Sequence, residues 1–289
     1  LTVKMGPKYI GIASEKEAPG SSYEGHPFLE ASSMRKFNGT YYFIYSSLNS
    51  HELCYATSRF PDRDFRFGGI LVSIGDLGLE GNSQAMNYTG NTHGGMVQLG
   101  QQWYIFYHRQ TNKQCCARQG CAEPITIRPD GSIPQAELTS CGLNGGPLRG
   151  TGTYEARIAC HLGYSEPSFG YIAVREPDTR HPYFTQSGTD REDNPDQYIA
   201  NMAQGAWCGF KYFDFRGQTG VQVVTRGDAQ GKLLVSLGKD TAPFAEVPIR
   251  PSSSWTTAEA QFPALEGVQA LYFRFQGTGA MDFKEFTLK

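Results

Sequence analysis

Short apolar stretches follow one another along the whole chain, and within them hydrophobic and polar residues tend to alternate. In the first half they cover residues 33–37, 41–46, 53–58, 69–73, 94–99, 103–107, 116–122 and 125–128. Turn-forming sequences such as Asn38-Gly39 and Asp130-Gly131 separate them. No window of a dozen residues keeps a helical period. The pattern therefore predicts an all-β fold.

These eight stretches form two groups of four, and each group begins with a loop that carries a polar candidate residue. Hairpins repeated in this way are typical of the blades of a β-propeller. Two blades cannot close a ring, and an open blade would expose unpaired backbone groups at its edge. We therefore expect an incomplete propeller over residues 1–138, with the remaining blades encoded upstream.

Residues 139–152 are rich in glycine and nearly uncharged, which indicates a linker. Beyond it, strands are predicted at residues 154–161, 171–174, 209–215, 221–225, 233–237, 244–249, 256–262, 270–275 and 281–288. Several alternate cleanly, as residues 271–275 do, so that one face is buried and the other is wet. The pattern predicts a β-sandwich of the jelly-roll kind over residues 153–289.

Glu30 is the leading candidate for a general acid. It stands just before a hairpin whose turn is Asn38-Gly39, the strongest short-range hairpin signal. A carboxylate at the start of a strand is better fixed than one on a free loop, and proton transfer to a substrate needs that fixity. Glu24 is the alternative, but it lies six residues too early for the hairpin spacing and is expected to brace the loop.

The segment from Glu30 through Ser32-Ser33 and a basic pair to Asn38-Gly39 and Tyr41-Tyr42 resembles the general-acid blade of glycoside hydrolase family 43. A second segment, from Asn91-Thr92-His93-Gly94 onward, resembles the following blade. The resemblance implies a five-bladed propeller and an inverting glycosidase, with Glu30 as acid and His93 near the axis, touching a bound ion or its waters. It leaves four residues as candidates for lining the pocket mouth: His26, His51, His108 and Arg109.

A family 6 carbohydrate-binding module resembles three stretches of the second half: residues 200–215, the surroundings of Trp255, and the closing strand. The resemblance implies a sugar platform, for which Trp255 and Tyr198 are the candidates, whereas Trp207 is expected in the core. Two positions depart from the module's pattern, with Asn201 in place of a stacking tyrosine and Ala280 in place of an asparagine. The module's structural calcium would use Glu155 and Asp282, although its usual second glutamate is Arg157 here.

Composition narrows the functional classes. The chain has 289 residues and a net charge of -2, which suggests neither a nucleic-acid groove nor a membrane-surface binder. No apolar run approaches the roughly 20 residues that a membrane span needs. Seven cysteines leave at least one unpaired within the chain, and Cys115, Cys116 and Cys121 lack zinc-site spacing. The first residue is Leu1, so we expect the natural N-terminus to be missing, and an extracytoplasmic location is favoured.

The sequence and its resemblances together predict the C-terminal portion of an inverting glycoside hydrolase. Its partner is an oligo- or polysaccharide of the arabinoxylan type, with no nucleic acid or membrane, and calcium is the one cofactor that the resemblance implies. The base of the family comes from earlier blades, so this portion alone is expected to be inactive. The alternatives are a non-catalytic carbohydrate-binding protein and a structural fragment.

Overall fold

The computed structural model describes residues 25–90, 92–164, 181–188 and 196–289, and all structural statements refer to these. Glu24 and the strand predicted at residues 171–174 lie outside them. Within them the chain is all-β, as predicted, with only two single 3-10 turns, Leu79–Gly81 and Ala156–Ile158. None of the described helical turns is long and apolar enough to cross a membrane.

The chain divides into two compact units. The first contains residues 1–83, 89–110 and 118–138, and the second contains residues 84–88, 111–117 and 139–289. Residues 139–152, predicted as a linker, differ from that expectation. Their strand β8 (Leu148–Arg149) pairs in parallel with residues 213–214, and Ser140 donates its backbone N–H to Lys211, so they are an integral part of the second unit.

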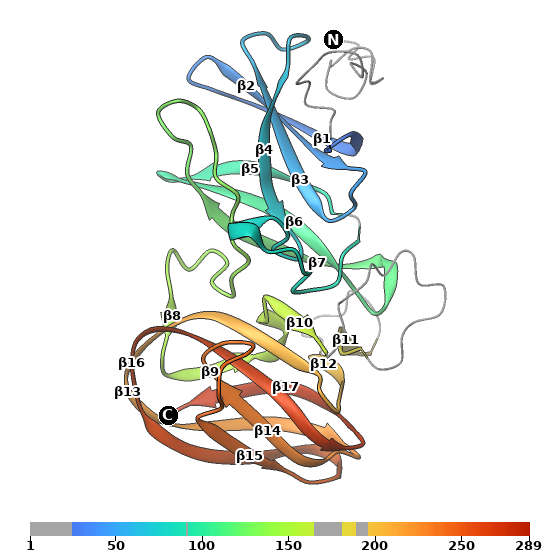
Figure 1. Ribbon diagram of the computed structural model, residues 1–289, viewed down its shortest axis with the longest axis vertical. Helices are drawn as coiled ribbons and strands as arrows, with labels where there is room; N and C mark the ends of the chain where they lie inside the picture. The colour runs from blue at the N-terminus through green and yellow to red at the C-terminus, as the bar shows by residue number, and fades with distance from the viewer. Residues whose placement is uncertain (1–24, 91, 165–180, 189–195) are drawn as a thin grey trace. The chain divides into compact units, whose positions relative to one another are not determined.

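A four-stranded antiparallel sheet opens the first unit, with its strands in chain order (Figure 1). Its strands are β1 (Phe28–Phe37), β2 (Thr40–Ser47), β3 (Glu52–Ser58) and β4 (Arg66–Ser73). Asn38 and Gly39 have φ values of 47° and 76°. Both are positive, as the tight turn between twisted strands requires, so the predicted hairpin is confirmed.

The second sheet of this unit has three strands rather than the predicted four. They are β5 (Gly94–Leu99), β6 (Gln102–Thr111) and β7 (Gln114–Ile125), in that order. The stretch at residues 125–128, predicted as a fourth strand, instead leads into a turn. The backbone N–H of Gly131 donates to the Arg128 carbonyl at 2.9 Å, and Asp130 accepts from Ser132. These hydrogen bonds close a turn, so the strand does not continue through residues 126–128.

Strand β1 is irregular around Glu30. Its register with β2 shifts between Phe28 and Glu30 and again between Glu30 and Ser33. Ala31, inside this bulge, has φ 61°, in the left-handed region that a non-glycine residue occupies only at a cost. Such bulges bend a strand and re-aim a side chain, so Glu30 does not follow the plain alternation of its neighbours.

Arg35 ties β1 to β5 within the first unit. Its Nε donates to the Met96 carbonyl at 2.8 Å, and its guanidinium also donates to Ser33. The approach is close, because a Cβ added to Gly95 would lie 2.8 Å from the Ser33 hydroxyl. Glycine at this position therefore allows the two sheets to meet beside Glu30 and His93.

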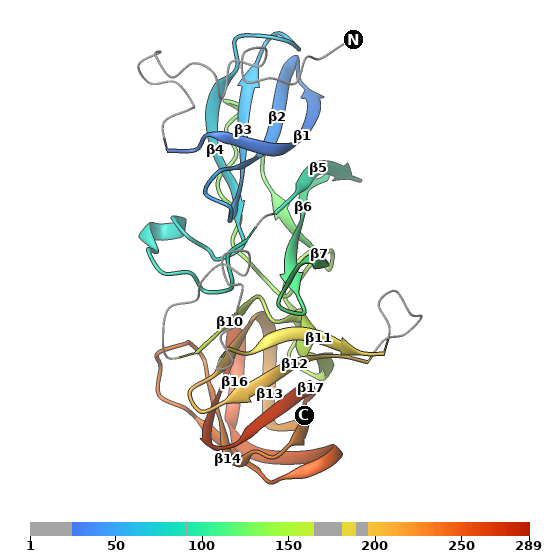
Figure 2. The same ribbon diagram turned by 90° about the vertical axis from the view of Figure 1, so that its right-hand side faces the viewer.

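One ten-stranded sheet folds over on itself to build the second unit (Figure 2). Besides β8, its strands are β9 (Gly152–Glu155), β10 (His161–Gly163), β11 (Tyr183–Ser187), β12 (Asp196–Ala203), β13 (Trp207–Gly227), β14 (Gln230–Ser236), β15 (Ala245–Ile249), β16 (Ser252–Thr278) and β17 (Ala280–Leu288).

Strands β13 and β16 each join two predicted strands into one. The first part of β13 pairs with the end of β16, and its last part pairs with the start of β16 and with β17. Register shifts between Arg216 and Gly220 separate the two parts. Because a strand can change layers at such irregularities, these two strands supply both faces of the sandwich. Between them lies an apolar core that includes the fully buried Phe210, Phe273 and Phe286.

Replacing Ala31 with glycine tests the strained bulge. Because glycine accepts a positive φ without the Cβ clash, Ala31→Gly is expected to raise the free energy of unfolding by about 0.5–1 kcal/mol. The matched control Ala56→Gly, at a position of β3 that does not have a positive φ, is expected to lower it by a similar amount. Urea unfolding of both variants is the measurement, and equal losses in the two would contradict a left-handed Ala31.

Candidate active site

Glu30 and His93 meet on the surface of the first unit. The Nε2 atom of His93 lies 2.9 Å from Oε1 of Glu30, and both side chains are partly exposed. Glu30 comes from the bulge of β1 and His93 from the residues just before β5. Among the residues that the structure describes, His93 is the hydrogen-bond partner of Glu30, and it contacts one of the two carboxyl oxygens.

The backbone around His93 is fixed from two directions. Its own N–H donates to Nε2 of His108 at 3.0 Å, and the preceding residue, Thr92, donates its hydroxyl to the His108 carbonyl at 2.8 Å. The Thr92 carbonyl accepts from the hydroxyl of Ser46. Ser46 is the residue that stands opposite Glu30 in the β1–β2 register. The same strand pair thus sets both halves of the Glu30–His93 contact.

His108 serves as an acceptor in this arrangement. Its Nε2 also lies 2.9 Å from a guanidinium nitrogen of Arg118, so two donors point at one ring nitrogen. Burial, the Arg118 charge and neighbouring His93 lower the pKa of His108 to about 4. The ring is therefore neutral at physiological pH and keeps the lone pair that the His93 amide requires.

His26 lies just before β1, and its ring stacks on Phe67 with the ring centres 4.7 Å apart. Its Nδ1 is 2.7 Å from Oε1 of Glu52, a carboxylate that is 1% exposed. The hydrogen bond to Glu52 and the stacking on Phe67 thus hold this histidine against the four-stranded sheet. Its predicted contact with sugar stays a prediction.

The other two residues predicted at the pocket mouth face inward. His51 shares a hydrogen bond of 3.0 Å with Ser73, and burial lowers the pKa of its imidazole. Arg109 is 7% exposed, and its Nε donates to Gln119 at 3.0 Å. The geometry brings together Glu30, His93 and His108 and leaves these two apart, in their own buried contacts.

The residues predicted to contact calcium are His93, Glu155 and Asp282, and their surroundings do not suit that ion. Calcium takes six to eight oxygen ligands, whereas His93 offers an imidazole that is already bonded to Glu30. In the second unit, Glu155 is paired with Arg157, and Asp282 accepts from Arg226 at 2.9 Å. Neither belongs to a set of three potential ligands within the described residues. These residues do not fit calcium, and no chemical step is assigned to it.

Tyr198 and Trp255, the predicted sugar platform of the second unit, are in contact with cationic side chains. Tyr198 and Trp255 meet edge to face at 5.4 Å, and the Arg226 guanidinium lies 4.8 and 4.2 Å from their ring centres. Lys284 lies 5.4 Å from the Trp255 ring. The indole N–H donates to Asp196 at 3.0 Å. Cation–π contacts therefore occupy much of the aromatic surface that a sugar would need.

Next to this cluster is a pocket of about 370 Å³. Its lining offers hydrogen-bonding groups, including the side chains of Asn201, Arg226, Ser253 and Asp282. Asn201 and Ala280, the two departures from the module's pattern, both line it. Trp207 is 5% exposed, so its predicted place in the core is confirmed.

Ser46, Arg118 and Glu52 have structural roles that the sequence did not reveal. Ser46 lies in an apolar run, and Arg118 lies among cysteines without a motif. For Glu52 a signal existed, because an acidic residue at the start of an apolar strand must have its carboxylate satisfied by neighbours. The hydrogen bonds that link these residues join segments far apart in the sequence, which spacing cannot show.

Comparison with known proteins adds independent information. Residues 181–289 match the family model for "Carbohydrate binding module (family 6)". A xylosidase/arabinosidase of Thermoclostridium stercorarium is 44% identical, and the match covers 100% of this chain and 61% of that protein. An arabinoxylan arabinofuranohydrolase of Paenibacillus polymyxa is 24% identical, with 94% of this chain and 41% of the relative covered.

A solved structure of a family 43 arabinoxylan arabinofuranohydrolase from Bacillus subtilis, in complex with cellotetraose, matches with a TM-score of 0.49 at 20% identity. The match covers 91% of this chain and 54% of that one. The chain thus spans less than two thirds of the length of each of these three relatives.

These matches relate the chain to carbohydrate-active proteins, over its whole length to a xylosidase/arabinosidase and over residues 181–289 to a carbohydrate-binding module. More particularly, the whole chain is a homologue of a xylosidase/arabinosidase, and its residues 181–289 match the family 6 carbohydrate-binding module. The resemblances seen in the sequence are thereby confirmed.

The lowered pKa of His108 predicts a dependence of stability on pH. The folded state holds this ring neutral down to about pH 4, whereas the unfolded chain protonates it near 6.5. Its contribution to stability is therefore complete above pH 6.5 and is lost as the pH falls toward 4. His108→Gln should flatten that part of the profile, measured as the free energy of urea unfolding. An identical decline in parent and variant would contradict the assignment.

Proposed function

We propose that this chain carries the proton-donating half of an inverting glycosidase acting on arabinoxylan-type glycans and releasing arabinose or xylose. The observation that carries the proposal is the contact of 2.9 Å between Glu30 and His93 on the surface of the first unit. The names of the relatives, xylosidase/arabinosidase and arabinoxylan arabinofuranohydrolase, support the substrate class.

Glu30 is proposed as the general acid. Cleavage of a glycosidic bond leaves an alkoxide unless the departing oxygen is protonated, and a positioned carboxylic acid supplies that proton. His93 holds one carboxyl oxygen, so the other is oriented toward the departing sugar. His108 and Ser46 act on the backbone around His93 and keep that contact in place.

The general base is proposed to lie in the part of the protein that this chain does not span. An inverting enzyme needs a second carboxylate about 6.5–9.5 Å from the first, with room between them for the attacking water. The two sheets of the first unit are proposed as two blades of a five-bladed propeller. On this account the chain by itself has an acid without its partner and is inactive, whereas the full-length enzyme has both.

Glu30→Gln in the full-length enzyme tests the acid. The amide cannot donate the proton, so hydrolysis of xylo-oligosaccharides, whose leaving groups need protonation, is expected to fall by about 10²–10⁴-fold in kcat. In a dinitrophenyl xyloside the leaving group is dinitrophenolate, which departs without protonation. Hydrolysis of this substrate should therefore change little. Steady-state kinetics on both substrates is the measurement.

The exposed Glu80, in the turn Leu79–Gly81, provides the matched control for that experiment. Glu80→Gln makes the same chemical change away from Glu30 and should leave both rates at the parental level. If Glu30→Gln hydrolyses both kinds of substrate as fast as the parent does, Glu30 is not the acid.

A second function, binding to polysaccharide, is proposed for the second unit because residues 181–289 match a carbohydrate-binding family. The cations around Trp255 and Tyr198 disfavour stacking of a sugar ring there. The pocket beside them offers amide, guanidinium and carboxylate groups that suit sugar hydroxyls. We therefore place the sugar contact in that pocket.

Retention of the chain on insoluble xylan checks this second proposal. Arg226→Met keeps the packing on Trp255 but removes the hydrogen-bond donors from the pocket, so the bound fraction should fall several-fold. Lys232→Met is the control, since Lys232 forms a surface pair with Glu246 at 2.8 Å and does not line the pocket. Equal retention of parent and both variants would remove Arg226 from the binding site, and no retention of the parent would contradict binding.

A further inference from the structure

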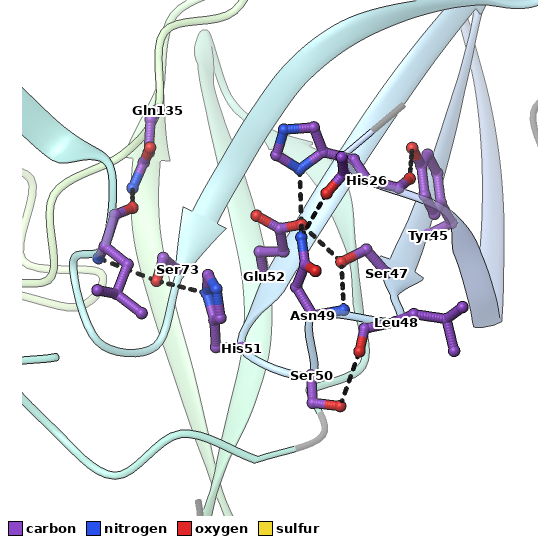
Figure 3. A network of polar contacts seen from close by, with 12 residues as sticks. His26, Tyr45, Ser47, Leu48, Asn49, Ser50, His51, Glu52, Ser73 and Gln135 are labelled. Carbon is purple, nitrogen blue, oxygen red and sulfur yellow. Dashed lines mark hydrogen bonds and ion pairs between the residues drawn. The ribbon is translucent and has the colours of Figure 1, made fainter. Parts of the chain in front are cut away.

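Glu52 is a buried carboxylate that the proposed chemistry does not use. It is the first residue of β3 and is 1% exposed. Three donors converge on its Oε1 atom: the Ser47 hydroxyl at 2.6 Å, the Asn49 amide at 2.7 Å and Nδ1 of His26 at 2.7 Å (Figure 3). This is a dense set of hydrogen bonds for one oxygen atom.

The ionised state of Glu52 follows from these contacts. Burial by itself would raise the pKa of the carboxyl, but the bonds from Ser47, His26 and Asn49 hold that pKa below its ordinary value. A buried charge is tolerated only when it is paired and hydrogen-bonded. The turn between β2 and β3 must therefore keep its shape around Glu52.

The same turn holds the segment that leads into β1. Three successive carbonyls accept hydrogen bonds from it or from the end of β2. The Gly25 carbonyl accepts from the Asn49 amide at 2.6 Å, the His26 carbonyl from the Tyr45 hydroxyl at 2.8 Å, and the Pro27 carbonyl from the Leu48 N–H at 2.9 Å. Asn49 binds both Glu52 and Gly25, so it connects the carboxylate directly to the segment.

Glu30 needs such an anchor because the pairing of its strand is irregular on both sides of it. The β1–β2 register shifts on both sides of Glu30, so regular ladder pairing is interrupted there. Downstream, Arg35 fixes the strand to the Met96 carbonyl. Upstream, the fixed point is the segment Gly25–Pro27. The bulge that carries Glu30 is thus fixed on its downstream side by Arg35 and on its upstream side by the backbone of residues 25–27. Glu52 organises the upstream contacts.

We propose that Glu52 is a positioning residue for Glu30 and acts through His26, Asn49 and the backbone of residues 25–27. This inference rests on the proposed role of Glu30 as the acid. At 1% exposure, the Glu52 side chain is shielded from a substrate at the surface. It sets the direction in which the bulge presents the proton donor.

A metal site is the competing interpretation of the same residues. Nδ1 of His26, a carboxylate oxygen of Glu52 and Sγ of Cys54 lie within 4.8 Å of one another. A thiol must lose its proton to bind a metal, whereas burial and the neighbouring Glu52 charge raise the pKa of Cys54. The Oε1 atom of Glu52 is also occupied by three donors. The contacts therefore favour an anchor over a metal site.

Kinetics of the full-length enzyme carrying Glu52→Ala tests the proposal. Because misplacing a catalytic group by about 1 Å can cost about 10²-fold, kcat on xylo-oligosaccharides should fall by about 10- to 100-fold with KM nearly unchanged. Hydrolysis of a dinitrophenyl xyloside, which needs no acid, should keep the parental rate. Glu52→Gln, which retains an acceptor oxygen, should restore part of the loss.

Glu123→Ala is the matched control, because Glu123 is also a buried carboxylate of the first unit, 1% exposed, and accepts from Tyr107. It should lose stability without a change in leaving-group dependence. Amide hydrogen exchange of this chain adds a readout without substrate. Exchange of residues 28–33 should accelerate in Glu52→Ala and stay at the parental rate in Glu123→Ala.

Equal losses on both substrates, or the same exchange pattern in both alanine variants, would overturn the positioning role. Stabilisation of the parent by Zn²⁺ that His26→Gln abolishes would favour the metal site and also overturn it. If Glu30→Gln shows no leaving-group dependence, the proposed acid fails, and the exchange comparison alone then decides whether Glu52 anchors β1.

Discussion

The hydrogen bond between Glu30 and His93 is the contact on which the functional account depends. It joins residues 63 positions apart in the sequence and brings a bulged strand of one sheet against the start of another. An exposed carboxyl group can sample many rotamers, and a hydrogen bond to an imidazole restricts them. The Ser46–Thr92 and His93–His108 contacts keep the two partners aligned from the backbone side. Removing any one of these supports would leave Glu30 and His93 present but would fix their relative positions less well.

The two units use charge in different ways. The first buries carboxylates such as Glu52 and Glu123 within hydrogen-bonded networks, and it therefore requires well-defined loop shapes. The second has a core of aromatic and aliphatic side chains, and its ion pairs, such as Arg226 with Asp282, lie nearer the surface. Apolar packing tolerates change more readily than a buried polar network. This contrast is in keeping with the roles proposed above, a positioned proton donor in the first unit and a binding surface in the second.

Much of the fold could be predicted from the sequence because the strands alternate and their turns use residues with distinct backbone preferences. The Asn38-Gly39 hairpin is the clearest case, since both residues adopt the positive φ that the turn requires. The continuous strands β13 and β16 could not be predicted. Irregularities between Arg216 and Gly220 let β13 pass from one layer of the sandwich to the other without ending. Glu30 and His93 could be selected as candidates from motifs. Their supports in Ser46, His108 and Glu52, and the cations around Trp255, depend on tertiary contacts that no local pattern encodes.

The most direct measurement is a crystal structure of the full-length enzyme with an intact substrate bound, obtained with a variant that cannot activate water. We expect one oxygen of Glu30 within about 2.6–3.2 Å of the glycosidic oxygen, with His93 on the other carboxyl oxygen. A bound glycan whose scissile bond lies away from Glu30, with that side chain turned toward solvent, would contradict it.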